Sequence, residues 1–380
     1  GELMNARILL AICLILAGLT GCASSHQTFL YTAGAGTNEV FGFQVRADGQ
    51  ITPLGQPTFA SGSGPVALAV HPPGDFFYIA NSAGNNLTLL NINKGNGELT
   101  IPPTNSALPP SPLSPPNVFS TGAGPVSVVV APNAPRAYVL NQASGNITAF
   151  LLDPSNGNLA LITNPPGNGA GATTTYGSFT APASMIISPK GDFLFVSSPS
   201  QSAVFSFAVN SGDGSLAPVA GSPFVQASGV TPVGLAVDPS GRFLYATDST
   251  NSTVLAFTIQ NGSLAPIGGS PFAAGAQPAG LATDPEGVEL LVSNSGSNDV
   301  SVYVIDPNAG ALAQVAGSPF ATGGRGPGFV AATGAFVYVA DQTTNDVAAF
   351  SRGSKGELIP VSGSPFSVPV SPAWITLASE

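Results

Sequence analysis

The sequence predicts an all-β fold, a seven-bladed β-propeller of four-stranded blades that is closed by pairing the C-terminal strand with the N-terminal strands. The first observation is a sequence motif that repeats along the chain and is clearest in residues 232–257 (PVGLAVDPSGRFLYATDSTNSTVLAF). Related copies begin at Pro65, Pro125, Pro182, Pro278, Pro327 and Pro372. Repeats of about 45 to 60 residues, each built from several short strands, are typical of propeller blades rather than of helical solenoids.

The second observation concerns the two ends of the chain. The last copy, residues 372–378 (PAWITLA), contains only the opening strand, and residues 29–43 (FLYTAGAGTNEVFGF) resemble its missing remainder. An open stack of small sheets would leave unpaired strand edges and apolar faces exposed. We therefore expect both ends to build one blade, which brings the count to seven and closes the ring.

The third observation is composition. The 380 residues include 46 Gly and 36 Pro, and only 7% are charged. Glycine and proline at this level supply the turns that many short strands need. Because the repeat runs from residue 29 to residue 380, the length does not indicate several domains, and we expect one closed propeller over 29–380.

Each element of the repeat follows from its residues. A small apolar strand, such as VGLAV after Pro232, suits the crowded centre of the ring, and a turn such as Asp238-Pro239-Ser240-Gly241 follows it. The second strand carries aromatics that would pack between blades, and the third alternates like a half-buried strand. The outermost strand ends in Gly-Ser-Pro-Phe at residues 221–224, 269–272, 317–320 and 363–366. Proline is tolerated there because an edge strand need not donate every hydrogen bond.

Two insertions lengthen the spacing between repeats. One, at residues 102–124, is rich in proline, and the other, at residues 164–181, is rich in glycine and threonine. We expect both in the connection from an outer strand to the next inner strand, and so on the same face of neighbouring blades. Long insertions on one face of a repeat array often mark a binding face. Drift in tolerant surface loops is the alternative interpretation.

The N-terminus predicts a bacterial lipoprotein. An apolar run of about a dozen residues follows Met4 and is too short to span a bilayer, so residues 1–21 are expected to be a signal peptide. Leu19-Thr20-Gly21-Cys22 resembles a lipobox, in which the cysteine is acylated. A cysteine buried behind a core helix is the alternative. Residues 22–28 would then be a lipidated tether, and Ala23 after the cysteine favours the outer membrane of the cell envelope.

Charge and cysteine content narrow the partners. The net charge is −10 with nine Lys plus Arg, so no basic patch is expected and nucleic acid is excluded as a partner. The two cysteines, Cys13 and Cys22, both precede the propeller, which leaves it without a disulfide. We expect a monomer held to a membrane through acylated Cys22.

With residues 232–257 and their relatives in view, the chain resembles the YVTN-type repeats and the seven-bladed lactonase propeller family, whose members are similar to 6-phosphogluconolactonase. The resemblance covers nearly all of residues 29–380. The resemblance implies that, in catalytic members of the family, an Arg-His pair directly follows the proline that opens an inner strand. Here the corresponding pairs are Val66-Ala67, Val126-Ser127, Ala183-Ser184, Val233-Gly234, Ala279-Gly280, Gly328-Phe329 and Ala373-Trp374. None is basic, so no catalytic residue carries over.

Candidate ligand-binding residues come from the face that carries the insertions. Arg325, in Gly323-Gly324-Arg325-Gly326 just before an inner strand, is the best candidate for an anionic ligand. Short polar residues recur at the ends of the second strands and could bind a sugar or a cation around the channel: Asn81, Asn141, Ser198, Asp248, Asn294 and Asp341. Capping of their own turns is the favoured alternative.

Other polar residues indicate structural roles. His71 occupies a turn position held by aspartate in other blades, and Arg242 and Arg136 are expected to be solvated next to such turns. We find no metal-binding motif, catalytic triad, dinucleotide fingerprint or phosphate loop, and we expect no cofactor and no metal.

Two functions remain open. The first is a non-catalytic envelope lipoprotein that presents one loop-rich face to a protein or a glycan. The second is a lactone hydrolase of the 6-phosphogluconolactonase type acting on a sugar lactone. Lactone hydrolysis needs a base and a donor or cation that stabilises the oxyanion, and the openings of the inner strands carry no basic residue. A resemblance of fold does not by itself distinguish a binding module from a hydrolase.

Overall fold

The computed structural model describes residues 27–34, 36–72, 74–102, 117–163 and 175–379. The expected signal peptide at residues 1–21 and the lipidation site Cys22 lie outside these residues. So does the expected tether at residues 22–28, except for Gln27, which is half-buried, and Thr28, which already belongs to the first strand.

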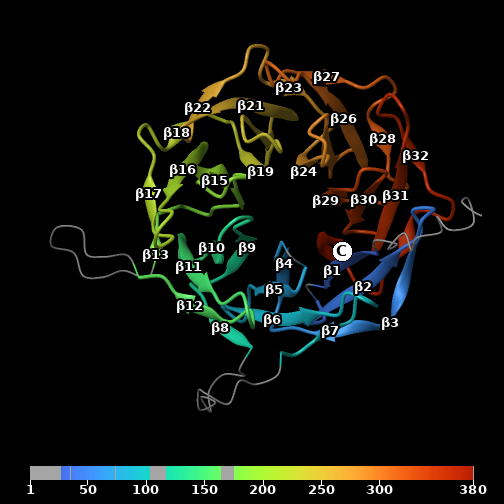
Figure 1. Ribbon diagram of the computed structural model, residues 1–380. Helices are drawn as coiled ribbons and strands as arrows, with labels where there is room; N and C mark the ends of the chain where they lie inside the picture. The colour runs from blue at the N-terminus through green and yellow to red at the C-terminus, as the bar shows by residue number, and fades with distance from the viewer. Residues whose placement is uncertain (1–26, 35, 73, 103–116, 164–174, 380) are drawn as a thin grey trace, which may run out of the picture.

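Seven antiparallel sheets surround a central axis, with one inner strand of each sheet nearest the centre (Figure 1). The prediction of a seven-bladed all-β propeller is confirmed. Blades 1 to 3, from the inside outward, contain these strands: β34 (Pro372–Ser379), β1 (Thr28–Gly34), β2 (Glu39–Val45) and β3 (Ile51–Ala60); β4 (Pro65–Val70), β5 (Phe76–Asn81), β6 (Asn86–Ile92), β7 (Leu99–Thr100) and β8 (Val118–Ser120); β9 (Pro125–Val130), β10 (Arg136–Asn141), β11 (Asn146–Leu152), β12 (Leu159–Leu161) and β13 (Thr175–Tyr176).

Blades 4 to 7 repeat the same order. They contain these strands: β14 (Ser184–Ile187), β15 (Phe193–Ser198), β16 (Ala203–Val209), β17 (Leu216–Pro218) and β18 (Phe224–Val225); β19 (Pro232–Val237), β20 (Phe243–Asp248), β21 (Thr253–Gln260), β22 (Ser263–Pro266) and β23 (Phe272–Ala273); β24 (Pro278–Thr283), β25 (Glu289–Asn294), β26 (Asp299–Ile305), β27 (Leu312–Gln314) and β28 (Phe320–Ala321); β29 (Pro327–Ala332), β30 (Phe336–Asp341), β31 (Asp346–Arg352), β32 (Leu358–Pro360) and β33 (Phe366–Ser367). A short 3₁₀ helix, Pro199–Gln201, follows β15.

Both chain ends build blade 1, as the truncated seventh repeat predicts. Strand β34 pairs antiparallel with β1, with Leu377 opposite Leu30 and Ser379 opposite Thr28. The closing strand supplies the inner position of the blade, and its Ile375 is buried in the core between blades 7 and 1. Closure therefore removes the free edge that β1 would otherwise present.

In blades 2 to 7 the outermost strand is interrupted, and both of its pieces pair with the third strand. In blades 4 to 7 the Gly-Ser-Pro-Phe motif forms the interruption, and its serine hydroxyl accepts the backbone N–H that the gap leaves free, for example Ser318 Oγ from the Val302 N–H at 2.8 Å. The same bond recurs at Ser222, Ser270 and Ser364. The motif thus keeps the edge of the blade hydrogen-bonded where its proline cannot.

The outer strand continues inside both ranges that the sequence pattern assigns to insertions. Strands β8 and β13 lie within residues 102–124 and 164–181, and they pair with the third strands of blades 2 and 3. The described residues that flank both insertions are therefore at the outer rim, at the position of the Gly-Ser-Pro-Phe gap in other blades (Figure 1). Among the described residues of the two ranges, 121–124 and 177–181 lie in the connection to the next inner strand, as expected, whereas the expectation is wrong for β8 and β13.

Neighbouring blades are joined through a repeated tyrosine on the second strand. Tyr245 donates its hydroxyl to the Gly310 carbonyl of the next blade at 3.0 Å, and Tyr78 donates to the Gly157 carbonyl at 2.6 Å. Tyr31, Tyr138 and Tyr338 make the equivalent bond, and Ser206 makes it from blade 4. Each is a buried bond worth about 1 kcal/mol. The aromatic second strand of the repeat therefore serves the contact between blades.

The joint between blades 6 and 7 departs from this pattern. Leu291 occupies the second-strand position at which five blades have tyrosine. In blade 4 that position is Phe195, and Ser206 on the third strand makes the bond instead. An ion cluster occupies the joint instead, with Arg352 Nη2 at 2.7 Å from Asp284 Oδ2 and 2.9 Å from Glu289 Oε2. The side chains of Asp284 and Glu289 are 1% and 7% exposed, so this pair of contacts is removed from solvent.

Candidate functional site

The propeller has two faces of different composition. One carries the hairpins between second and third strands together with the connections that lead to the inner strands, and we call it the mouth face. The two sets of loops interlock, as in the bonds from Ser82 N to Gly64 O at 2.7 Å and from Gln342 N to Gly326 O at 3.0 Å. The opposite face carries the remaining turns.

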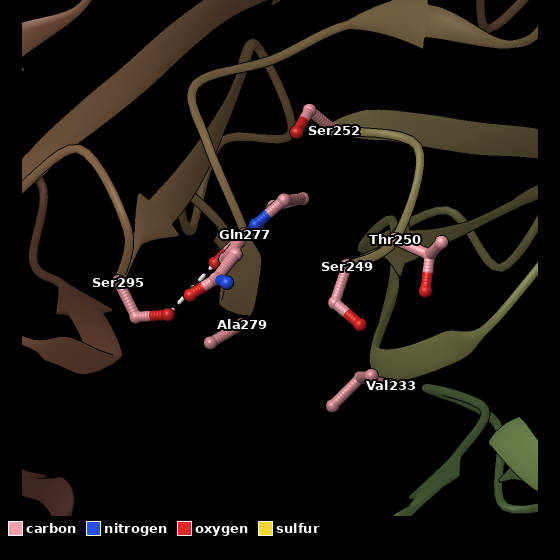
Figure 2. A pocket seen from close by; sticks show the side chains of 8 residues that line it. Val233, Ser249, Thr250, Ser252, Gln277, Ala279 and Ser295 are labelled. Atoms are coloured by element: carbon pink, nitrogen blue, oxygen red, sulfur yellow. Dashed lines mark hydrogen bonds between the residues drawn. The ribbon is translucent and has the colours of Figure 1, made fainter.

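A pocket of about 580 Å³ opens on the mouth face between blades 5 and 6 (Figure 2). Its lining is polar but uncharged and consists of Val233, Ser249, Thr250, Ser252, Gln277, Pro278, Ala279 and Ser295. The four hydroxyls come from two hairpins, residues 249–252 of blade 5 and Ser295 of blade 6, and Ser295 Oγ donates to the Gln277 carbonyl at 2.9 Å. Gln277 is exposed, and its amide has no hydrogen bond within the described chain. The pocket therefore offers neutral donors and acceptors.

The floor of this pocket is the place where the family resemblance implies basic residues. Val233 and Ala279 are the first residues after the prolines that open β19 and β24. The next residues, Gly234 and Gly280, lie so close to the following inner strand that a Cβ would collide with backbone; at Gly280 it would be 2.5 Å from the Gly328 carbonyl oxygen. A histidine at either position has no room in this ring.

The same tier of the channel is aromatic on the side of blades 7 and 1. Phe329 and Trp374 have ring centroids 4.0 Å apart, and both are half-buried. Phe329 Cα is 3.0 Å from the point that a Cβ on Gly280 would occupy, so this aromatic pair adjoins the inner strand that forms part of the pocket.

Cations are almost absent from the mouth face. The described chain contains eight Lys and Arg residues, and seven of them lie at the turns of the opposite face: Arg46, Lys94, Arg136, Lys190, Arg242, Arg352 and Lys355. The eighth is Arg325. A single cation at the mouth cannot supply the several charges that would hold an anionic sugar phosphate and stabilise an oxyanion.

The structure places Arg325 where the sequence predicts it, on the connection entering β29. Its side chain is exposed and makes no hydrogen bond or ion pair with the described residues, whereas its backbone N–H donates to Thr344 Oγ1 at 2.9 Å. It is the one sequence-predicted site residue that is free to meet a ligand.

The asparagines at the ends of the second strands are buried rather than exposed to the channel. Asn81, Asn141 and Asn294 have no exposed surface, and each amide donates to the first side chain of the third strand and to a hydroxyl two residues later. Asn294, for example, donates to Asp299 Oδ1 at 2.7 Å and to Ser301 Oγ at 2.9 Å. These contacts match the turn-capping alternative, because no side-chain donor is left for a ligand.

Asp248 and Ser198 also cap loops. Asp248 is 1% exposed and accepts from the Thr231 N–H at 3.0 Å and from Asn251 Nδ2 at 2.7 Å. Ser198 is buried and donates to the Thr180 carbonyl at 2.8 Å. Both residues hold the connection to an inner strand against the hairpin beside it.

Asp341 differs from the other five. It has no exposed surface, and neither of its carboxylate oxygens has a hydrogen-bond partner in the described part of the chain. Burial raises the pKa of Asp341 to about 7, and the negative charge of Asp346 adds to the rise. The nearby Thr322 hydroxyl, which donates to the Asn298 carbonyl at 3.4 Å, acts on this pKa in the opposite direction. Although this pKa would suit a general base, the carboxylate cannot touch a substrate, because the connection of residues 322–326 covers it.

The remaining polar candidates lie on the opposite face. His71 is buried against Phe76, with ring centroids 5.5 Å apart, and burial lowers its pKa despite the opposing charge of Asp75. Arg242 is exposed, as predicted. Arg136 is not solvated as expected, since it is 6% exposed and donates to the Asn210 and Ser211 carbonyls of the next blade. Arg136 is buried because it lies in the joint between blades 3 and 4.

Sequence reasoning missed the pocket residues Ser249, Thr250, Gln277 and Ser295. A signal was present, because each lies within two residues of the end of a second strand or directly precedes an inner-strand proline. Their convergence depends on how blades 5 and 6 pack. Within the described residues, no three His, Cys, Asp or Glu side chains are arranged to hold a metal, and no helix is long and apolar enough to span a membrane.

Comparisons with known proteins agree with this architecture. The family model described as "Lactonase, 7-bladed beta-propeller" matches residues 22–117, 113–271 and 263–376. The comparison with curated proteins gives no match. A candidate 6-phosphogluconolactonase from Bacteroides fragilis is similar in structure, with a TM-score of 0.74 and 20% identity over 94% of this chain and 99% of that one. The periplasmic gluconolactonase of Pseudomonas aeruginosa has a TM-score of 0.71 and 19% identity over 93% and 99%.

At these identities the solved structures establish the fold, and the family model, which matches along nearly the whole ring, carries the assignment. The chain belongs to the seven-bladed lactonase β-propeller family.

Proposed function

We propose that this chain is a non-catalytic binding module that takes a neutral, polyhydroxylated ligand such as a glycan at its mouth face. The observation that carries the proposal is the pocket between blades 5 and 6, whose eight lining residues include four hydroxyls and one amide and no ionisable side chain. Its volume of about 580 Å³ suits one or two sugar rings. Neutral donors and acceptors recognise hydroxyl groups without discriminating by charge.

The second candidate is a lactone hydrolase acting on a sugar lactone. It is favoured by family membership and by the structural likeness to proteins described as gluconolactonases. A sugar lactone is itself a neutral polyhydroxylated ring and would fit the same pocket. The chemistry argues against turnover, because the pocket holds no base to activate water and no cation to stabilise an oxyanion.

We further propose that the module is a lipoprotein of the bacterial cell envelope, anchored through acylated Cys22 and directed to the outer membrane. The lipobox supports this proposal. Changing Cys22 to serine should move the protein from the membrane fraction to the soluble fraction and abolish incorporation of labelled fatty acid. Retention of both properties in Cys22→Ser would contradict the anchor.

The binding proposal is tested with the full chain, purified in detergent, against a panel of neutral and anionic oligosaccharides. Gln277→Ala should weaken binding of the best neutral ligand by about tenfold, because the Gln277 amide is exposed and free to bond a hydroxyl. Gln314→Ala is the control, since Gln314 is also an exposed glutamine but lies on the outer strand β27, away from the pocket. Equal affinities for wild type and both variants would reject the pocket as the site.

The hydrolase alternative is tested with gluconolactone and its 6-phosphate. We expect no hydrolysis above the rate in buffer. Turnover that Arg325→Ala abolishes would overturn the binding-module proposal, because it would make the single cation of the mouth face part of a catalytic site.

A further inference from the structure

Blades 2, 3 and 6 share one arrangement of side chains at the end of the second strand, and blade 7 has the same backbone geometry with different side chains. In blades 2, 3 and 6 an asparagine amide donates twice, to a side-chain oxygen at the start of the third strand and to a hydroxyl two residues later. In blade 7 the three positions are Asp341, Asp346 and Ala348. The amide donor and the hydroxyl have both been lost.

The geometry of the site is retained although its donors are gone. In blades 2, 3 and 6 a glycine of the covering connection faces the asparagine nitrogen; a Cβ on Gly62 would be 2.5 Å from Asn81 Nδ2. In blade 7 a Cβ on Gly324 would be 2.5 Å from Asp341 Oδ2 and 2.5 Å from Asp346 Oδ1. Oδ2 of Asp341 thus takes the place of the amide nitrogen and faces the Asp346 oxygen that should accept from it.

Both oxygens lack a hydrogen-bond partner, and Asp341 is fully buried while Asp346 is 7% exposed. An Oδ1 atom without a hydrogen-bond partner occurs at Asn81, Asn141, Asn294 and Asp341, so this atom does not distinguish blade 7. Blade 7 differs because two acceptor oxygens face each other where the other blades have an amide donor and an acceptor. Two buried carboxylates that converge beneath the same glycine cannot both stay ionised without a large free-energy cost, and one proton between them restores the missing donor.

No neighbouring charge provides another solution. Strands β29 and β34 and the hairpin of residues 342–345 carry no ionisable side chain, and β31 carries only Asp346 and, at its far end, Arg352. On the covering connection the only charged residue is Arg325, which is exposed. In the adjoining hairpin of blade 6 Asp299 already accepts from Asn294 and Ser297.

We propose that Asp341 and Asp346 share one proton, and that this proton holds the connection of residues 322–326 against blade 7 at the channel mouth. The Asp341 Oδ2–H group donates to Asp346 Oδ1, as Asn294 Nδ2 donates to Asp299 Oδ1 in blade 6. When the pH rises, the proton passes to water, the two carboxylates repel each other, and the connection that carries Arg325 loosens. The site is a proton-binding latch and does not depend on which ligand the pocket takes.

The covering connection is suited to respond. Its backbone is held by bonds to neutral side chains: Gly324 N to Thr322 Oγ1 at 3.2 Å, Arg325 N to Thr344 Oγ1 at 2.9 Å and Gly326 N to Asn298 Oδ1 at 2.9 Å. None is an ion pair, so repulsion directly beneath Gly324 meets only weak restraint. A divalent cation is a poorer occupant, because calcium takes six to eight oxygen ligands and this pair offers few.

The sign of the pH dependence follows from the raised pKa of Asp341. The folded protein retains a proton that the unfolded chain has lost, so the stabilisation is complete below the ordinary carboxyl pKa and declines as the pH rises to about 7. Asp341→Asn supplies a permanent amide donor and should lose this part of the pH dependence. Asp346→Asn removes the repulsion between the two carboxylates but leaves Asp341 buried, so it should keep the part of the pH dependence that burial causes.

The experiment compares the melting temperatures of the full chain and the two variants from pH 5 to pH 8.5, with EDTA and with 5 mM CaCl₂ in separate arms. We expect Asp341→Asn to melt several degrees above wild type at pH 8.5 and near wild type at pH 5. Hydrogen exchange at residues 324–326, corrected for intrinsic rates, should speed up in wild type above pH 7 and not in Asp341→Asn.

Three outcomes would overturn the proposal. The first is a constant difference in melting temperature between wild type and Asp341→Asn across the pH range. The second is unchanged exchange at residues 324–326 in wild type above pH 7. The third is stabilisation of wild type by calcium at pH 8.5 that Asp341→Asn abolishes, which would make the pair a cation site instead of a proton site.

Discussion

Replacement of Arg352 by alanine should be among the most destabilising single changes at a joint between blades. The Arg352 side chain is 12% exposed and binds Asp284 Oδ2 at 2.7 Å and Glu289 Oε2 at 2.9 Å. Its removal leaves two carboxylates buried without their counter-ion. Breaking a buried ion pair by removing one partner typically costs about 3 to 5 kcal/mol.

That cost converts into a measurable shift. An unfolding entropy of about 2.1 cal/mol/K per residue over roughly 350 residues gives about 0.7 kcal/mol/K, so the melting temperature should fall by about 4 to 7 °C. Differential scanning calorimetry of the full chain in detergent at pH 7 measures the change. Arg46→Ala is the control, because the Arg46–Asp48 pair is 3.9 Å apart and more than half exposed, and it should shift the melting temperature by about 1 °C or less.

The pH dependence gives an independent check. Burial acts to raise the pKa of Asp284, but hydrogen bonds from the Glu289 N–H and from Arg352 outweigh it and hold the pKa below its ordinary value. The stabilisation is therefore present above the ordinary carboxyl pKa and is lost as the pH falls through the lowered value. The gap between wild type and Arg352→Ala should narrow below about pH 4. A variant that melts within 1 °C of wild type at pH 7 would refute the reasoning.

Three further changes probe the ring. Tyr245→Phe removes the hydroxyl that donates to the Gly310 carbonyl at 3.0 Å and should cost about 1 to 2 kcal/mol in urea unfolding with an unchanged m-value; no loss would show that water replaces the bond. Gly234→Ala should cost about 1 to 3 kcal/mol because its Cβ meets the Ala279 carbonyl, whereas Gly268→Ala, where the space is open, should melt like wild type; equal melting of the two would contradict the close approach. Deletion of residues 372–380 removes β34 and should abolish cooperative melting by circular dichroism; a truncated monomer that still melts cooperatively would disprove closure.

Much of the fold could be predicted because its signals are local and repeated. The repeated motif after each opening proline predicts an inner strand, a turn and two further strands. The structure has these elements at nearly the residues that the motif predicts. The split outer strand is harder to anticipate, because it depends on a long-range bond in which the Ser318 hydroxyl accepts the Val302 N–H of the neighbouring third strand. For the same reason the sequence pattern does not show that β8 and β13 pair with the third strand within the two insertion ranges.

The candidate site was predictable in position but not in accessibility. The sequence correctly places Arg325 at the mouth, and it places Asn81, Asn141 and Asn294 at the ends of second strands. Whether such a side chain faces the channel or its own turn depends on the glycine that covers it, which comes from another part of the chain. The missing donor at Asp341 and Asp346 can be recognised only by comparison with the asparagine amides at the same position in blades 2, 3 and 6.

The sequence by itself determined the number of blades, the closure of blade 1 by both ends and the lack of basic pairs on the inner strands. Each of these is a property of short segments and their repetition, so no long-range contact is needed to read it. Only the tertiary structure decided that blades 5 and 6 enclose an uncharged pocket, that Gly234 and Gly280 leave no room for a side chain, and that two carboxyls meet under Gly324. These features arise where distant residues pack together, and packing distances are not encoded in any local pattern.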